Sequence, residues 1–395
     1  MKISSLSSQF TEIVTFLSKI GYIFNLINYI QLKMKLAFLF SAGLLFISYF
    51  SSAQITAPKY SNEFLSIGVG ARGMAMGNVQ TALVDDVTSG YWNPAGLTKI
   101  KNKYEIALMH AEYFAGIAKY DYGAIATQID SQSTIGLSVI RFGVDDIADT
   151  RYLFDSDGNN NGKINYNNIR YFSSSDYAFI LTYARKSHLI KGLSLGANFK
   201  VIYRNVGDFA NAWGFGLDAG AQYQKKKWLM GLMLRDVTGT FNAWTNNTEL
   251  VRDVYTKTGN DIPQNSIEVT LPKMILGVGR NFKVSKKIGI LASTDIIFTF
   301  DGKRNTVIKT NFTSIDPTIG LEANYNKIVF LRAGLGNIQQ IKNFDGGTYT
   351  SIQPNFGVGI KIYKFTIDYA LTNIGNVSES LYSNVFSLKF SFDSI

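Results

Sequence analysis

The sequence predicts an all-β protein, a transmembrane β-barrel of about 14 antiparallel strands with an N-terminal segment in its lumen. Three observations lead to this prediction. Apolar and polar residues alternate through most of the chain beyond residue 103, and the alternating runs are about ten residues long. Short and long connections between these runs follow one another alternately along the chain. A tilted strand needs about ten residues to cross a bilayer.

The N-terminus carries an export signal at residues 34–53. It combines flanking lysines, an apolar run of about 15 residues and small residues before Gln54. We therefore expect Met34 to be the true start, residues 1–33 to be a mis-called upstream extension, and Gln54 to begin the mature chain. An uncleaved anchor is the weaker alternative. Because alternating strands pass the inner membrane where an apolar helix would stop, an exported barrel is expected in the outer membrane.

Composition excludes several function classes. The net charge of +10 is spread thinly along the chain, so neither it nor export supports nucleic-acid binding. The chain has no cysteine, which excludes disulfides, thiol catalysis and cysteine-ligated zinc. Its two histidines, His110 and His188, are expected near opposite ends of the barrel, so a catalytic triad or a two-histidine metal site is disfavoured.

Residues 54–102 are rich in glycine and small side chains and are expected to pack inside the barrel, since irregular backbone at membrane depth must be covered by protein or line a cavity. Glycines 68, 70, 73 and 77 lie too close together for a stable helix interior. Residues 93–96, Asn-Pro-Ala-Gly, predict a turn that ends the segment. The glycine spacing also matches a dinucleotide-binding fingerprint, but no parallel βαβ unit surrounds it.

Residues 103–395 are predicted to form the barrel. In residues 193–204, for example, Leu, Leu, Ala, Phe, Val and Tyr alternate with positions that are mostly polar or glycine. The alternating runs lie near 103–110, 118–128, 133–142, 176–186, 192–204, 213–225, 227–237, 271–281, 287–300, 316–326, 327–336, 353–362, 363–372 and 382–392.

The connections alternate in length. Links after the even-numbered runs are tight and often basic, whereas those after the odd-numbered runs are mostly longer, with the longest at 143–175, 238–270, 301–315 and 337–352. Short turns at one end and long loops at the other are typical of an outer-membrane barrel. A secreted β-sandwich or propeller is the alternative, and no helical stretch of ten residues is expected.

Several blocks resemble the outer-membrane proteins of the FadL superfamily, and most closely the PorV/PorQ family associated with the type IX secretion system. The resemblance rests on residues 70–77, 85–86, 91–97, 175–179 and 183–186. It implies a 14-stranded barrel whose N-terminal segment is a hatch. The hatch motif residues would be Gly70, Arg72, Gly73, Gly77, Asp85, Asp86, Asn93, Pro94, Ala95 and Gly96.

The resemblance also implies a function. The chain would be a non-enzymatic protein that shuttles cargo, or docks partners, for type IX secretion. Its partners would be outer-membrane lipid and secretion components or cargo proteins. The alternative is a FadL-like channel for hydrophobic small molecules, gated by the hatch. An outer-membrane enzyme is the third and least favoured hypothesis.

Two outer loops carry further candidate sites. Residues 157–168 resemble a calcium-binding loop without its final glutamate, so the loop is either a weak calcium site or a plain polar loop. The calcium ligands would be Asp157, Asn159, Asn161, Lys163 and Asn168. No other cofactor is expected. The aromatic residues Trp213, Phe241, Trp244 and Tyr255 are expected in outer loops, either anchoring at the membrane interface or binding a partner.

Charged residues on the lumenal faces of the strands are expected to pair with one another. They are Asp218, Arg235, Asp295, Glu322, Arg332 and Asp368.

Overall fold

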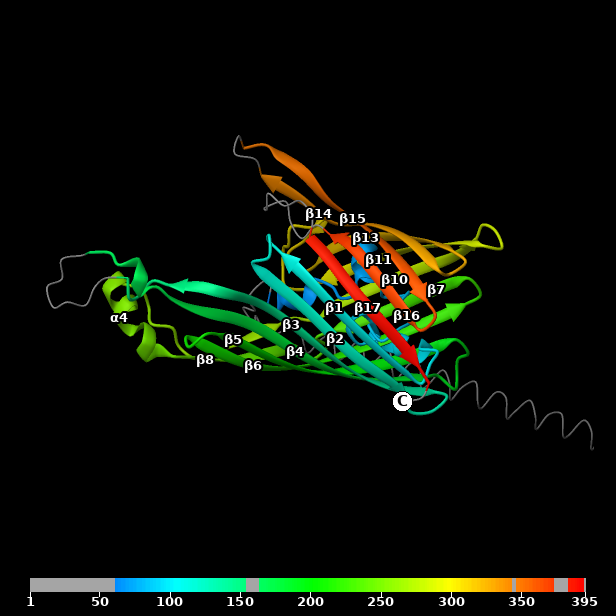
Figure 1. Ribbon diagram of the computed structural model, residues 1–395, viewed down its shortest axis with the longest axis horizontal. Coiled ribbons are helices and arrows are strands. Elements are labelled where there is room, and N and C mark those ends of the chain that lie inside the picture. Colours follow the sequence, from blue (N-terminus) through cyan, green and yellow to red (C-terminus); the bar gives the residue numbers. More distant parts are fainter. Residues whose placement is uncertain (1–60, 154–162, 343–345, 373–382, 394–395) are drawn as a thin grey trace, which may run out of the picture. The chain divides into compact units, whose positions relative to one another are not determined.

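The structure, a computed structural model, describes residues 61–153, 163–342, 346–372 and 383–393 (Figure 1). The upstream extension, the export signal and the first residues of the mature chain lie outside these ranges, so their assignments stay predictions.

The described strands form one closed antiparallel barrel. The first strand pairs with the second and also with the last, so that Tyr104 lies opposite both Thr127 and Phe392. Fourteen strands make the wall, which confirms the predicted fold, and each matches one alternating run of the sequence. They are β1 (Tyr104–Tyr113), β2 (Ala118–Gln128), β3 (Ser133–Asp149), β4 (Arg170–Lys186), β5 (Leu193–Val206), β6 (Ala210–Lys225), β7 (Trp228–Arg235), β10 (Lys273–Lys283), β11 (Ile288–Thr299), β13 (Ser314–Tyr325), β14 (Val329–Lys342), β15 (Thr348–Ile362), β16 (Phe365–Thr372) and β17 (Ser383–Phe392).

The wall has an apolar outer face and a mostly polar or small-residue lumenal face. Along β1, Glu105, Ala107 and Met109 are buried, whereas Leu108 is 55% exposed. The same alternation exposes a band of large apolar side chains around the outside, as a lipid-facing surface requires. Its members include Leu108, Ile125, Leu137, Leu181, Leu195, Leu321, Ile367 and Leu388.

The tight turns lie at one end, as predicted, but two of the predicted long loops are shorter than expected. Strands β3 and β4 continue into the predicted loop at 143–175, and β14 and β15 continue into that at 337–352 (Figure 1). Bulges interrupt the registers at 144–147 and 336–339, where Asp146 and Asn337 have positive φ. Because a bulge breaks the period-two alternation, the sequence pattern ends before the strand does.

The predicted loop at 238–270 is structured. It contains β8 (Thr240–Asn246), helix α4 (Thr248–Thr258) and β9 (Ser266–Thr270), and a two-residue strand, β12 (Ile308–Lys309), lies in another outer connection. The expectation of no helix was wrong for α4. The helix has an Asn247 N-cap and a Gly259 C-cap and buries none of its residues. Its apolar residues Leu250, Val251, Val254 and Tyr255 have helical spacing, a short signal that sequence reasoning missed.

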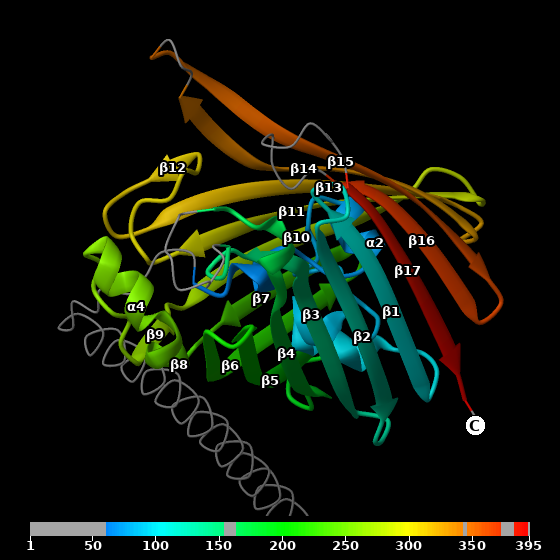
Figure 2. The same cartoon turned by 60° about the vertical axis from the view of Figure 1, so that its left-hand side comes forward.

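Residues 61–100, which we call the lumenal segment, lie inside the barrel (Figure 2). Their short helices are η1 (Glu63–Ser66), α2 (Ala71–Ala75), α3 (Ser89–Trp92) and η2 (Pro94–Lys99). Wall glycines let this backbone approach closely. A Cβ atom at Gly320 would lie 2.6 Å from the carbonyl oxygen of Met76, and one at Gly196 would lie 2.5 Å from the carbonyl carbon of Pro94.

Another 3-10 turn, η3 (Tyr166–Asn168), follows the outer end of β3. Among the described residues, no helix combines the length and apolarity needed to cross a membrane.

Candidate functional site

The candidate site is the contact between the lumenal segment and the barrel wall. Three motif glycines shape the start of the segment. Gly70 has a φ of 74°, and its carbonyl oxygen accepts hydrogen bonds from the next turn of backbone. A Cβ atom at Gly73 would lie 2.9 Å from the indole ring of Trp92. Gly77, with a φ of 66°, lies against the backbone of Leu335. Each position therefore requires a residue without a Cβ atom or one that tolerates positive φ.

Asn93 joins the segment to the wall. It is fully buried, and its side-chain amide donates hydrogen bonds to the carbonyl oxygens of Thr81 (2.8 Å), Ala221 (3.1 Å) and Leu232 (3.3 Å). Its backbone is extended, with a φ of −160°, as expected for a residue before proline, and η2 begins at Pro94. One side chain thus contacts the lumenal segment and two wall strands, β6 and β7.

Residues 95 and 96 complete this turn. Ala95 is fully buried, and its N–H donates to the side-chain oxygen of Asn93 at 3.2 Å. A Cβ atom at Gly96 would lie 2.8 Å from the hydroxyl oxygen of Ser89. The Asn-Pro-Ala-Gly turn therefore has room only for small residues after the proline.

Arg72 anchors α2 in a buried charge network. Its guanidinium lies 3.0 Å from the carboxylate of Glu322 and 2.8 Å from that of Asp85. Arg332 lies 2.7 Å from Glu322 and 2.7 Å from Asp368. The Arg332 side chain is only 2% exposed, so the centre of the network is shielded from bulk solvent. The Asp85 side chain is 49% exposed, so it is the member of the network that contacts solvent.

Asp86 makes a second ion pair with the wall. Its carboxylate lies 2.7 Å from Nζ of Lys389 and accepts a hydrogen bond from the N–H of Thr88. Burial opposes ionisation of Asp86, but the charges of Lys389 and Arg72 outweigh it and hold the pKa of this carboxyl well below its usual range. Beside this pair, Glu105 accepts a hydrogen bond from the N–H of Val87 at 2.7 Å.

Two other wall charges bind backbone rather than each other. Arg235 donates to the carbonyl oxygens of Leu65 (3.1 Å) and Tyr91 (3.0 Å). Asp295 accepts from the N–H groups of Gln80 and Thr81 at 3.0 and 2.9 Å. Pairing between lumenal charges is thus confirmed for Glu322, Arg332 and Asp368. It was wrong for Arg235 and Asp295, which satisfy polar backbone of the lumenal segment.

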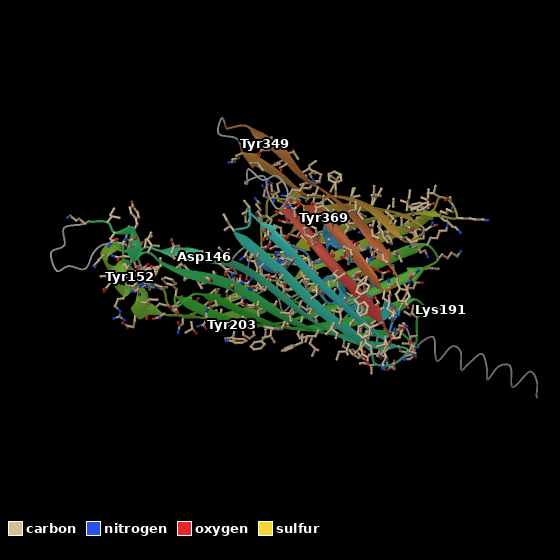
Figure 3. All side chains as sticks on the ribbon, in the orientation of Figure 1. Asp146, Tyr152, Lys191, Tyr203, Tyr349 and Tyr369 are labelled. Atoms are coloured by element: carbon tan, nitrogen blue, oxygen red, sulfur yellow. The ribbon has the colours of Figure 1, made fainter. Side chains whose placement is uncertain are left out.

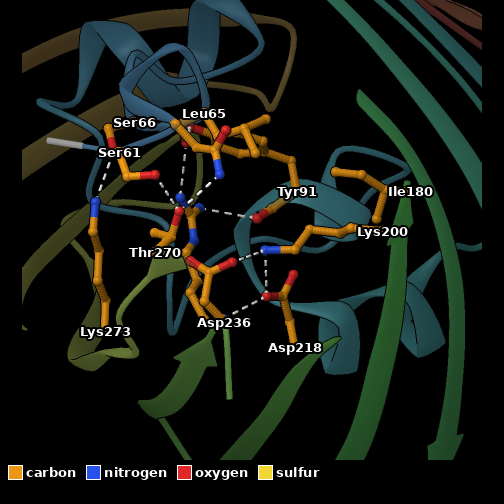
Figure 4. Close-up of a pocket in the computed structure, with 12 residues that line it drawn as sticks. Ser61, Leu65, Ser66, Tyr91, Ile180, Lys200, Asp218, Asp236, Thr270 and Lys273 are labelled. Carbon is orange, nitrogen blue, oxygen red and sulfur yellow. Dashed lines mark hydrogen bonds and ion pairs between the residues drawn. The ribbon is translucent and has the colours of Figure 1, made fainter. Parts of the chain in front are cut away.

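Asp218 pairs with Lys200, which sequence reasoning missed. The two charged groups lie 2.8 Å apart, and Asp236 also contacts the Lys200 ammonium, beside a hollow of about 20 Å³ (Figure 4). That volume holds about one water molecule. Lys389 and Glu105 were missed too. All three missed residues are lone charges among polar or small residues on lumenal strand faces, which is the signal that would have found them.

The aromatic candidates lie mainly on strands rather than in outer loops. Trp213 is on β6, Phe241 and Trp244 are on β8, and only Tyr255 lies outside a strand, in α4. The long outer strands explain the difference. Trp213 packs against Tyr203, with ring centroids 4.7 Å apart, and is 50% exposed. Outward-facing aromatic rows of this kind are typical of the membrane interface.

Trp244 differs from the other aromatic candidates because it is tied to charged groups. Its ring N–H donates to Glu268 at 2.8 Å, and the guanidinium of Arg204 lies 5.0 Å from its ring centroid.

Of the candidate calcium ligands, Asp157, Asn159 and Asn161 lie outside the described residues. Only Lys163 and Asn168 of the five lie among the described residues, and these two do not test the site, so calcium binding stays a prediction. The described residues contain no cluster of three or more possible metal ligands.

The histidines lie apart, as expected. His110 on β1 contacts Asp121 at 2.7 Å, and His188 in the turn after β4 contacts Arg185 at 3.0 Å. Neither contacts the other, and both are exposed.

Comparisons with known proteins place the fold. The model of an uncharacterised protein family, UPF0164, matches residues 45–228. No curated protein matches the chain. The solved structure of the CymD monoaromatic hydrocarbon channel is similar, with 13% sequence identity over 83% of this chain and 98% of that chain and a TM-score of 0.50. The Pseudomonas putida toluene transporter TodX has 12% identity over 83% of this chain and 99% of that chain, with a TM-score of 0.52. At such identities the likeness shows the fold alone, and the chain shares the barrel fold of these two proteins.

Proposed function

We propose that this chain is a non-enzymatic outer-membrane barrel of PorV/PorQ type that docks cargo or partner proteins of the type IX secretion system on its outer side. The observation that carries the proposal is the division of the barrel into a filled lumen and a structured outer extension. The lumenal segment contacts the wall through buried charges and close backbone packing. The strands, in contrast, continue outward beyond the membrane-length span.

The outer extension is built as a firm surface. Strands β3, β4, β5 and β6 are 14 to 17 residues long, more than the length that crosses a bilayer, and β8, α4 and β9 extend the same side (Figure 2). Arg151 ties this extension together. It pairs with Asp149 at 2.7 Å, donates to the carbonyl oxygen of Leu250 in α4 at 3.0 Å, and stacks 4.4 Å from the ring centroid of Phe209.

This surface offers side chains suited to protein contacts. Tyr171 and Ile267 are 64% and 71% exposed on the outward face of the extension. Arg204, Trp244 and Glu268 form a mixed aromatic and charged group on its inner face. Aromatic residues and arginine are enriched at protein interfaces. Trp244 and Tyr255 are the candidate partner-binding residues that fit this surface best.

The docking proposal is tested by affinity purification from outer membranes and by secretion assays. We expect the chain to co-purify with secretion components or with cargo. The Arg151→Ala variant, which frees α4 from β3, should recover much less of the same partner. Arg185→Ala is the matched control, because Arg185 lies at the tight-turn end. Normal secretion in a deletion strain, together with failure to recover such partners, would contradict the proposal.

A second candidate function is a channel for hydrophobic small molecules gated by the lumenal segment. The supporting observation is the fold shared with a hydrocarbon channel and a toluene transporter. The absence of cysteine allows a clean test with engineered disulfides. The hydroxyl oxygens of Ser61 and Thr270 lie 2.7 Å apart, and those of Thr98 and Ser194 lie 2.8 Å apart, so cysteine pairs at these sites would lock the segment to the wall.

The two functions predict different results for the locked barrels. A channel loses uptake of toluene or fatty acids when locked, and regains it with a reductant. A docking protein shows no uptake defect in the deletion strain, and its locked form still binds its partner.

A further inference from the structure

The tight-turn end of the barrel is strongly basic. The six tight turns and the residues that flank them carry many lysines and a single carboxylate, that of Asp130. The lysines are Lys186, Lys191, Lys225, Lys226, Lys227, Lys283, Lys286, Lys287, Lys327, Lys361 and Lys364. In outer-membrane barrels the short turns face the periplasm, so this charge is presented to the periplasmic side.

A hollow of about 710 Å³ lies within this basic end. It is bounded by the turns after β2, β4 and β6 and by the end of the lumenal segment, and Figure 3 shows Lys191 at this end of the barrel, far from Tyr152 of the outer extension. No carboxylate is among the described residues that line it. The lysines that line it are Lys99, Lys186, Lys191, Lys225 and Lys226.

The turns that carry these lysines are held in place by backbone contacts. The N–H of Gln224 donates to the carbonyl oxygen of Gly192 at 2.9 Å, which joins the turn after β4 to the end of β6. Gly192 has a φ of 89°, which favours glycine. Lys186 donates from Nζ to the carbonyl oxygen of Ser131 at 2.9 Å, which joins the turn after β2. The hollow is therefore preformed.

The floor of the hollow belongs to the lumenal segment. Thr98 donates a hydrogen bond to Ser194 of β5 at 2.8 Å, and Lys99 follows it. Burial lowers the pKa of Lys99, and the Asp85 carboxylate raises it by less, so Lys99 gains from an anionic partner. Thr98 and Lys99 line the hollow on its lumenal side and Leu193 and Tyr223 on its outward side, so it lies across the rim of the barrel end.

We propose that this hollow is a docking site for an acidic peptide segment of a periplasmic protein. Several lysines around one concave surface, without an acidic neighbour in its lining, favour a chain with several carboxylates over a single small anion. The position at the barrel end favours a water-soluble partner over lipid headgroups, which lie around the outer wall. The inference rests on the orientation of the barrel and is independent of what the outer extension binds.

The test measures binding of a fluorescent oligoglutamate peptide to the full mature barrel in phosphatidylcholine nanodiscs. The variant Lys191→Glu/Lys225→Glu/Lys226→Glu reverses charge at the hollow. The matched control Lys283→Glu/Lys286→Glu/Lys287→Glu makes the same change of charge at the same end but outside the lining. We expect salt-sensitive peptide binding that weakens about tenfold or more in the first variant and less than about twofold in the control.

A second probe guards against misfolding of the variant. The charge-reversed hollow should gain binding to an oligolysine peptide, which an unfolded barrel or the control variant would not show selectively. Equal weakening in both variants would mean general electrostatic attraction and would overturn the proposal. So would an absence of oligoglutamate binding, or a charge-reversal effect seen only with phosphatidylglycerol vesicles, which would assign the hollow to lipid.

Discussion

Replacing Lys389 with methionine should release the lumenal segment from the wall. Lys389 on β17 pairs with Asp86 at 2.7 Å, and the Asp86 side chain is 9% exposed. Methionine keeps much of the length of the side chain and removes the charge. Asp86 is then left ionised and buried, one residue before Val87, whose N–H binds the carboxylate of Glu105. The variant therefore leaves these two neighbouring carboxylates without the ammonium of Lys389, and Arg72 is the cation that remains for Asp86.

The expected cost follows from the burial of this pair. Removing one partner of a buried ion pair costs about 3–5 kcal/mol, because the other charge stays desolvated. The hydrogen bonds from Thr88 to Asp86 remain in the variant, and Lys389 is 22% exposed, so the lower end of this range applies. A cost of about 3 kcal/mol raises the population of the released segment on the order of 10²-fold.

Limited trypsin digestion measures this release. Arg72 is a trypsin site whose side chain is 19% exposed in the lumen, so cleavage after it reports movement of the segment out of the wall contact. We expect Lys389→Met to accelerate this cleavage on the order of 10²-fold. Asp86→Asn/Lys389→Met, which removes both charges and keeps the acceptor for Thr88, should restore most of the protection. Unchanged cleavage in the single variant, or no rescue in the double variant, would refute the reasoning.

Three further predictions concern the same contact and the outer loop. Because the folded-state pKa of Asp86 is depressed, the ionised carboxylate stabilises the folded protein above the unfolded-state pKa of about 4, and this stabilisation is lost progressively as the pH falls below that value. Cleavage of the lumenal segment around Arg72 by an acid-tolerant protease should therefore increase below about pH 4. The increase should be smaller in Asp86→Asn. Gly320→Ala should loosen the segment by about 1–3 kcal/mol because its Cβ would lie 2.6 Å from the Met76 oxygen, whereas Gly123→Ala, with its nearest contact at 3.7 Å, should change cleavage little; equal effects would contradict the packing argument. If residues 157–168 bind calcium weakly, a chelator should increase proteolysis within them, and unchanged digestion would identify a plain polar loop.

The barrel could be predicted from sequence because each wall strand faces two different environments. Where Leu108 faces lipid and Met109 faces the lumen, the sequence must alternate, and the alternation locates the strands. Prediction from the alternation failed where the chain no longer has lipid on one side and the lumen on the other. At Asp146 and Asn337 bulges shift the register, and the apolar residues of α4 have helical rather than period-two spacing. These elements lie in the outer connections, where neither lipid nor a packed lumen imposes a period.

The candidate site was harder to predict because its contacts join residues far apart in sequence. Arg72 and Glu322 are 250 positions apart, and Asp86 and Lys389 are 303 apart. Choosing between the partners of a lumenal charge requires the strand register and the path of the lumenal segment together. The sequence predicted that Arg235 and Asp295 lie in the lumen but not that they bind backbone there, since that depends on which N–H and carbonyl groups of the segment lack partners.

The chemistry of the contact bears on the choice between docking and conduction. The segment is held by ion pairs, by Asn93 and by backbone packing against wall glycines, as well as by apolar contacts near β1 and β2. Desolvation offsets much of the attraction in a buried ion pair, so such pairs fix position more than they add adhesion. A segment that moved into a wet lumen would regain solvation for these charges, and the pairs alone would oppose opening only weakly.

The close backbone packing opposes opening more strongly, because it is distributed around the wall. Gly196 on β5, Gly320 on β13 and Gly357 on β15 each admit a different part of the segment, so displacement must break these contacts together. A channel would need that concerted movement in each transport cycle, whereas a docking protein would not. The locked Ser61→Cys/Thr270→Cys and Thr98→Cys/Ser194→Cys barrels separate these cases, since they hold opposite ends of the segment. Loss of function in only one locked barrel would locate the movement at that end, and retained function in both would leave the segment a permanent part of the wall.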